Sequence, residues 1–72
     1  MINSTESLGK FGKRLKELRK AEKKSQKEMA VLLGCTPSNY QKIEYGQVNV
    51  SITTLIALAD FFGVTTDYLL DR

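Results

Sequence analysis

Residues 26–45 read QKEMAVLLGCTPSNYQKIEY, and the fold of the chain follows from this stretch. Its first half begins directly after Ser25, which is followed three positions later by Glu28. This is the spacing of a capping box, in which each side chain accepts a hydrogen bond from the other residue's backbone N–H. Gly34 then supplies the left-handed residue that ends many helices. We therefore expect a helix over residues 26–33.

The second half of the stretch predicts another short helix. Thr36 is a good N-cap, and Pro37 stands at the first helical position, where its missing N–H is not needed. The helix continues over residues 37–45. Only three residues separate the two helices, so they must cross steeply in a helix-turn-helix arrangement. Tyr40 and Ile43 are expected to pack the second helix onto the first.

Three further helices surround this pair. Apolar residues at intervals of three and four predict an amphipathic helix over residues 9–22. Ser51 caps a fourth helix that Gly63 closes, and Thr65 caps a short fifth one. The inward residues that we expect are Leu8, Phe11, Leu15, Leu18, Met29, Leu32, Leu33, Ile52, Leu55, Ala59 and Phe62. No segment has a strand pattern, so the predicted fold class is all-α, a compact five-helix bundle.

Length and composition limit what the chain can do. Seventy-two residues allow one small domain, residues 8–72, after a flexible N-terminal arm, residues 1–7. With no histidine and one cysteine, a zinc site is nearly excluded, and a Ser-His-Asp or Cys-His catalytic pair cannot be built. The longest apolar runs are five residues, far below the about 18 that a membrane span needs. We expect a cytoplasmic binding module without cofactor, metal, membrane segment or enzymatic activity, and without a further domain after residue 72.

The positive charge is concentrated in the first half of the chain. Residues 1–36 carry nine basic and four acidic residues, whereas residues 37–72 carry two basic and four acidic ones. All nine basic residues of the first half lie between Lys10 and Lys27. A solvated helix face explains such a run, and so does a surface that binds a polyanion such as nucleic acid. Charge alone leaves both interpretations open.

Residues 11–70 resemble the phage Cro/repressor-type helix-turn-helix domain, also called the xenobiotic-response-element family. The pieces that carry the resemblance are Leu18-Arg19, Ser25-Gln26, Ala30 with Gly34, Ile43-Glu44 with Gly46, and Gly63-Val64-Thr65. The chain departs from the family pattern where Lys23 and Lys24 replace a glycine and an apolar residue. Val50 stands where a proline is usual, and Tyr40 fills a slot that is more often aliphatic. The resemblance implies a lambda-repressor-like DNA-binding domain whose second and third helices form the helix-turn-helix.

The outward face of residues 37–45 is the candidate reading surface. Its amide, hydroxyl and ammonium groups match base edges in the major groove, although an ordinary solvated face has a similar composition. The resemblance places Pro37, Ser38 and Lys42 at base-reading positions, with Thr36 at their edge and Gln41 beside them. Candidate phosphate contacts are Gln26 at a helix N-terminus, Lys27, Asn39, Tyr45, Gln47 and Asn49.

Arg19 and Glu44 carry opposite charges on the inward sides of their helices. A lone buried charge is costly, so we expect the two side chains to form a structural ion pair, as the resemblance also implies. The alternative is that both side chains extend along the surface and keep their charged ends in water.

Phe61 lies opposite the inward face of its helix and close in sequence to Tyr68 and Leu69. An exposed apolar patch of this kind marks an interaction surface. We expect these three residues to contribute to a homodimer interface. Contact between Phe61 and the fifth helix of the same chain is the alternative.

Together these features predict a sequence-specific regulator of transcription that binds double-stranded DNA. We expect a repressor that acts as a homodimer on a two-fold operator, because one recognition helix contacts few base pairs. The alternative is an antitoxin or another module that binds a protein partner through the apolar surface.

Overall fold

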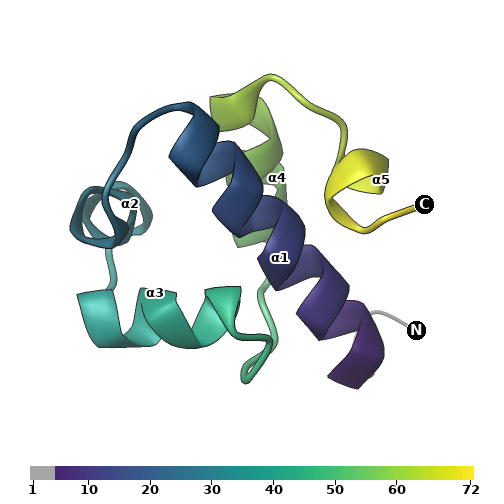
Figure 1. The fold of residues 1–72 in the computed structure, drawn as a ribbon, viewed down its shortest axis with the longest axis horizontal. Helices are drawn as coiled ribbons and strands as arrows, with labels where there is room; N and C mark the ends of the chain where they lie inside the picture. Colours follow the sequence, from purple (N-terminus) through teal and green to yellow (C-terminus); the bar gives the residue numbers. More distant parts are fainter. Residues whose placement is uncertain (1–4) are drawn as a thin grey trace.

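The computed structural model describes residues 5–72, which form five α-helices and no strand (Figure 1). The helices are α1 (Thr5–Ala21), α2 (Gln26–Leu33), α3 (Pro37–Glu44), α4 (Ile52–Phe62) and α5 (Thr66–Leu69). Figure 1 shows α1 running across the molecule, with α2 and α3 on one side of it and α5 on the other. The all-α five-helix bundle predicted from the sequence is confirmed. No described helix has both the length and the apolar character that crossing a membrane requires.

Four of the helices begin at the predicted N-caps. Each cap side chain accepts a hydrogen bond from the backbone N–H three residues later, and the caps are Ser25, Thr36, Ser51 and Thr65. At the start of α2 the capping box is complete, because the Ser25 N–H also donates to Glu28 Oε1 at 2.8 Å. Gly34 and Gly63 close α2 and α4 with φ of 70° and 66°. Local sequence therefore sets these boundaries.

Helix α1 begins earlier than the sequence predicts. Residues 5–7, which we assigned to the flexible arm, form its first turn. The carboxylate of Glu6 lies in this turn, where its negative charge interacts favourably with the positive end of the helix dipole. Lys10 Nζ lies 3.4 Å from Glu6 Oε1, one turn further along the helix. Apolar periodicity starts only at Leu8, so it gives no signal for this turn. The rest of the predicted arm, residues 1–4, lies outside the described residues.

The core lies where the five helices meet. Its buried members are Phe11, Leu15, Met29, Ala30, Tyr40, Ile43, Leu55, Leu58, Ala59 and Leu69. Two residues that we expected inside are exposed: Leu32 by 48% and Ile52 by 76%. The inward arc of α4 is centred on Leu58, which is fully buried, and this leaves Ile52 beyond its edge. In α2 the buried residues are Met29 and Ala30, and Leu32 falls outside the face that they define.

Candidate nucleic-acid interface

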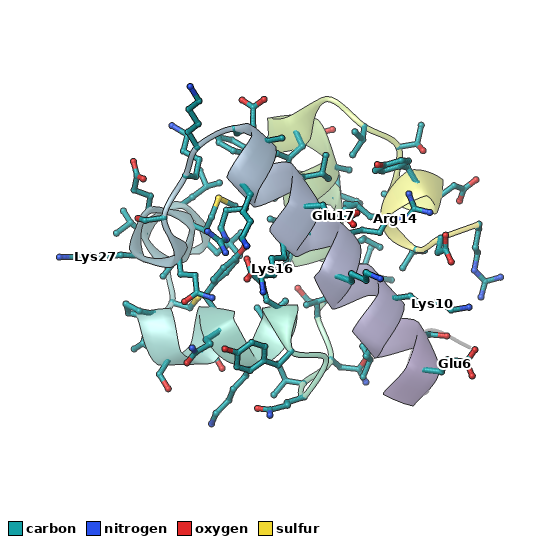
Figure 2. The ribbon with its side chains drawn as sticks, viewed as in Figure 1. Glu6, Lys10, Arg14, Lys16, Glu17 and Lys27 are labelled. Atoms are coloured by element: carbon teal, nitrogen blue, oxygen red, sulfur yellow. The ribbon has the colours of Figure 1, made fainter. Side chains whose placement is uncertain are left out.

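Helix α3 has a buried face and an exposed polar face. Tyr40, Ile43 and Glu44 are buried against the rest of the domain. The predicted base-reading residues are all exposed, namely Thr36, Pro37, Ser38, Gln41 and Lys42. Figure 2 shows side chains projecting from the side of α3 that faces away from α1. The helix therefore presents a continuous set of hydrogen-bonding groups to its surroundings.

Two hydrogen bonds order the exposed face of α3. Thr36 Oγ1 accepts from the Asn39 backbone N–H at 3.1 Å, so this hydroxyl holds the start of the helix. Near the C-terminal end of α3, Gln41 Nε2 donates to the Tyr45 hydroxyl at 3.2 Å. Ser38 lies within the span of the first contact and Lys42 within that of the second, and the two are one helical turn apart. Both side chains are therefore available to a ligand that lies along α3.

The buried side of α3 is fixed by the carboxylate of Glu44, which accepts hydrogen bonds from three other side chains. Arg19 Nε donates to Glu44 Oε2 at 2.6 Å, and Arg19 Nη2 donates to Oε1 at 3.3 Å. The Tyr40 hydroxyl donates to Oε2 at 2.5 Å, and Gln26 Nε2 donates to Oε1 at 3.2 Å. Arg19 Nη1 also donates to the Lys24 carbonyl at 2.9 Å. The expected Arg19–Glu44 pair is thus part of a network that joins α1, α2 and α3.

The network keeps Glu44 ionised although its side chain is buried. Burial alone raises the pKa of the Glu44 carboxyl, but hydrogen bonds from Arg19, Tyr40 and Gln26 outweigh burial and hold that pKa below its ordinary value. Burial, followed by the hydrogen bond to the Glu44 carboxylate, raises the pKa of the Tyr40 phenol above its ordinary value. At neutral pH the Glu44 carboxyl is therefore ionised and the Tyr40 phenol keeps its proton.

Gln26 occupies a position that the sequence analysis described only in part. It begins α2, as expected for a residue that meets a phosphate, but it is half-buried and its amide nitrogen is bonded to Glu44. Sequence reasoning missed this link because the two residues are 18 positions apart and no local spacing connects them. The other candidate phosphate contacts are all exposed: Lys27, Asn39, Tyr45, Gln47 and Asn49.

The basic residues of α1 and α2 lie on different sides of the domain. Figure 2 shows Lys16 on the side of α1 that faces α3 and Lys27 extending outward from α2, whereas Lys10 and Arg14 lie on the α5 side. Arg14 Nη2 lies 2.5 Å from Asp71 Oδ1, and Lys10 Nζ lies 3.9 Å from Asp71 Oδ2. Part of the basic run therefore ties the C-terminal residues to α1 and is not available to a polyanion near α3.

The three candidate dimer-interface residues do not form one exposed patch. The structure corrects the assignment of Leu69, which is fully buried, because it is the residue of the single-turn helix α5 that faces the core. Tyr68 is exposed, and the Arg14 guanidinium carbon lies 4.6 Å from its ring centroid. Phe61 is exposed but lies beside α2, with its ring edge-to-face against Phe62 at a centroid distance of 4.9 Å.

Comparison with known proteins supports the same fold and family. The helix-turn-helix family matches residues 15–69. The SPbeta prophage-derived uncharacterized HTH-type transcriptional regulator YonR of Bacillus subtilis (strain 168) is 43% identical over 60 residues, covering 83% of this chain and 56% of that protein. The HTH-type transcriptional regulator ImmR of the same organism is 38% identical over 62 residues, covering 86% of this chain and 49% of that protein. The chain spans about half the length of these curated relatives.

A solved structure extends the comparison to three dimensions. The restriction-modification controller protein C.AhdI from Aeromonas hydrophila superposes with a TM-score of 0.75 and 40% sequence identity. The match covers 86% of this chain and 94% of that one. The chain therefore belongs to the helix-turn-helix family, of the Cro/C1 type found in transcriptional regulators.

Proposed function

We propose that this domain binds duplex DNA at a specific sequence, with α3 in the major groove, and represses transcription as a homodimer on a two-fold operator. The observation that carries the proposal is the division of α3 into an exposed polar face and a buried face anchored at Glu44. An anchored helix presents its base-reading groups in one orientation, which sequence recognition requires. The HTH-type regulators among its relatives support the assignment to transcription.

Base reading is assigned to the exposed side chains of α3. Lys42 carries an ammonium group that can donate to guanine O6 and N7, and Gln41 can pair with adenine N6 and N7. Ser38 lies one turn from Lys42, so the two reach neighbouring base pairs. Thr36 and Pro37 lie at the N-terminus of α3, the end of a recognition helix that contacts base edges in this class of domain.

Phosphate contacts position the domain on the duplex and are assigned to residues around α3. Lys27 is exposed on α2 and Asn39 on α3, and Tyr45, Gln47 and Asn49 are exposed just after the end of α3. Gln26 stands at the N-terminus of α2, where free backbone N–H groups and the helix dipole favour an anion. Its hydrogen bond to Glu44 supports this assignment, because it holds the side chain at that helix end.

The homodimer is assigned to the α5 side of the molecule. Tyr68 is 41% exposed there, and α5 lies across α1 from α2 (Figure 1). A dimer is needed because one recognition helix contacts few base pairs, and two half-sites related by a two-fold axis multiply the specificity. We also propose a cytoplasmic location, because such a regulator acts where its operator DNA is. No enzymatic activity is proposed.

Selection of duplexes from a random pool, followed by binding titrations, tests the proposal. The selected duplex should bind at least about 10³-fold more tightly than a scrambled one. Its affinity should fall with salt, with a slope of log K against log [salt] steeper than about −3, because each neutralised phosphate contributes about −0.9. A reporter gene with the selected site in its promoter should be expressed less when the protein is present.

A pair of lysine variants controls the titration. Lys27→Ala should make the salt slope shallower by about 1 per subunit, because it removes one phosphate contact. Lys10→Ala removes the same charge on the α5 side, where Lys10 faces Glu6 and Asp71, and should leave the slope unchanged. Equal affinity for selected and scrambled duplexes, with a flat salt dependence, would reject DNA recognition.

A further inference from the structure

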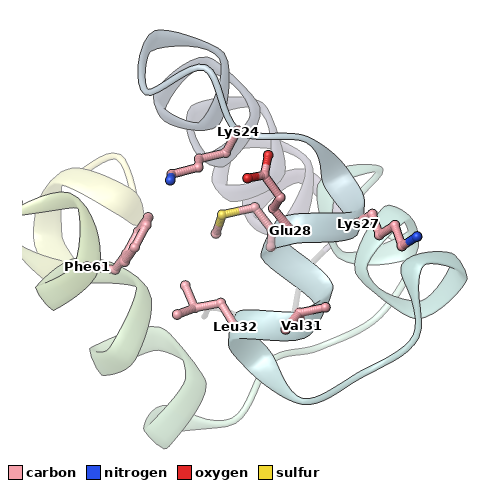
Figure 3. A pocket seen from close by; sticks show the side chains of 7 residues that line it. Lys24, Lys27, Glu28, Val31, Leu32 and Phe61 are labelled. Carbon is pink, nitrogen blue, oxygen red and sulfur yellow. The ribbon is translucent and has the colours of Figure 1, made fainter.

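A groove of about 430 Å³ lies between α2 and α4, away from the exposed face of α3; Lys27 is the one proposed DNA contact that borders it. Figure 3 shows Leu32 from α2 and Phe61 from α4 facing each other across it. Met29 and Val31 add further apolar lining. Leu32 and Phe61 are 48% and 41% exposed, so the domain leaves two large apolar side chains uncovered at one place.

The rim of this groove carries the ammonium group of Lys24, which attracts the nearby Glu28 carboxylate electrostatically but forms no close ion pair with it. In Figure 3 the amino group of Lys24 extends over the groove toward Phe61, whereas that of Lys27 points away. Lys24 forms no salt bridge with any carboxylate of residues 5–72. The nearby Glu28 carboxylate is held in the capping box by the Ser25 N–H. The groove therefore combines apolar walls with an ammonium group at its edge that forms no salt bridge with residues 5–72.

The charged residues around the groove indicate which kind of molecule it binds. Residues 20–28 read KAEKKSQKE, so four lysines and two glutamates lie at this end of the domain. A second copy of the chain would bring two such basic segments together, which is unfavourable. An occupant with carboxylates beside its apolar residues would instead be attracted to this end. The charge pattern therefore favours an acidic partner over self-association.

We propose that the α2–α4 groove binds an acidic amphipathic helix of a partner protein. An apolar side chain of the partner helix inserts between Leu32 and Phe61, and a carboxylate about one turn away pairs with Lys24. This is the helix-in-groove mode of recognition, in which apolar anchors supply affinity and flanking charges supply selectivity. No residue that lines the groove comes from α3. The partner therefore binds without covering the reading face, and the proposal does not depend on DNA binding.

Two synthetic peptides that need no knowledge of the partner test this proposal on the wild-type protein. Both are amphipathic helices with the same leucine and phenylalanine anchors, one flanked by glutamates and the other by lysines. Titration into ¹⁵N-labelled protein should show about tenfold tighter binding of the acidic peptide. The amide shifts should concentrate on α2 and on the second half of α4. Equal affinity for the two peptides, or shifts that concentrate elsewhere, would overturn the proposal.

Matched variants then locate the contact. Lys24→Glu should reverse the preference between the peptides, whereas Lys20→Glu, the same charge change on a residue outside the groove lining, should preserve it. Phe61→Ser should weaken the acidic peptide about tenfold or more. Ile52→Ser removes another exposed apolar side chain and should have no effect. An effect of Ile52→Ser equal to that of Phe61→Ser would reject the groove as the site.

Two further measurements separate this partner from other occupants. Sedimentation of the free protein, with amide spectra recorded across concentrations, reports whether a second copy fills the groove; groove shifts that grow with protein concentration would overturn the proposal. Addition of a selected operator duplex reports whether DNA uses the same surface. The acidic peptide should remain bound in the presence of the duplex, and its displacement would overturn the separation of the two sites.

Discussion

Gly12 on α1 lies directly against the backbone carbonyl of Glu44 at the end of α3. A Cβ built on Gly12 would overlap this carbonyl group, which consists of backbone atoms and cannot rotate away. The two helices therefore touch through their backbones beside the Arg19–Glu44 ion pair. The position of α3, and with it the candidate reading face, depends on this close approach.

Gly12→Ala should destabilise the domain by about 1–3 kcal/mol, because the new methyl group must push α1 and α3 apart. Urea unfolding followed by circular dichroism measures the change. Gly9→Ala is the matched control in the same helix, since its Cβ would meet no atom within 4 Å. Alanine is the better helix former, so the control should gain about 0.5–1 kcal/mol. Equal effects of the two substitutions would show that the close approach does not limit the packing.

Breaking the buried ion pair should cost far more stability than breaking the exposed one. Arg19→Met and Glu44→Gln should each cost about 3–5 kcal/mol, because each leaves its buried partner without compensation. Arg14→Met breaks the exposed contact with Asp71 and should change the stability much less. Chemical unfolding of the three variants at neutral pH gives the comparison. Similar losses for Arg14→Met and Arg19→Met would argue against burial as the cause.

The lowered pKa of Glu44 predicts a loss of stability in acid. Because its folded-state pKa lies below the ordinary value of 4.5, the unfolded chain takes up a proton first as the pH falls. The stabilisation from ionised Glu44 is complete above pH 4.5 and is lost as the pH falls through the folded-state pKa. Unfolding free energies measured between about pH 6 and pH 3 should fall less steeply in Glu44→Gln than in the wild type. The same slope in both proteins would assign acid sensitivity to other carboxylates.

Assembly should depend on the α5 side of the molecule and not on the groove. Tyr68→Glu should shift sedimentation toward monomer and weaken operator binding, because it places a charge in the proposed interface. Phe61→Glu changes a residue of equal exposure that lies beside α2, and it should remain dimeric. Helical content should stay near that of the wild type in both. A monomeric Phe61→Glu together with a dimeric Tyr68→Glu would move the interface to the groove.

Local sequence predicted the helices because their ends depend on short-range contacts. Ser25 and Gly34 bound α2 through hydrogen bonds and dihedral angles that need only neighbouring residues. The pairing of Arg19 with Glu44 could also be predicted, since both lie on the inward sides of amphipathic helices. Two opposite charges that face the same core are expected to pair, because an unpaired buried charge is strongly destabilising.

Contacts between helices were less predictable, because periodicity shows which side of a helix is apolar but not what covers it. Leu32 and Leu69 illustrate this in opposite directions, one expected inside and found exposed, the other expected in an exposed patch and found buried. The contact of Gly12 with Glu44 and the hydrogen bond from Gln26 to Glu44 depend on how α1, α2 and α3 cross. The spacing of residues along the sequence does not predict the angles and distances at which these helices cross.

Lys42 and Gln26 separate base reading from backbone contact. Lys42→Ala should cost about 1–3 kcal/mol on the selected operator and relax the preference at one base pair of each half-site, because a groove contact to guanine is lost. Gln26→Ala should weaken the operator and random duplexes by similar factors, since a phosphate contact carries no sequence information. Binding titrations of each variant against the operator and its single-base changes measure both effects.

Stability must be measured in parallel, because Gln26 also donates to the buried Glu44 carboxylate. The cost of losing this hydrogen bond should be about 1.5–3 kcal/mol. Lys42 is exposed and bonded to no described carboxylate, so Lys42→Ala should unfold like the wild type. Part of the affinity lost in Lys42→Ala comes from charge alone, and only the change in base preference identifies a base contact. Equal loss on every duplex would show that Lys42 meets phosphate, and the reading role would then fall to Ser38 and Gln41.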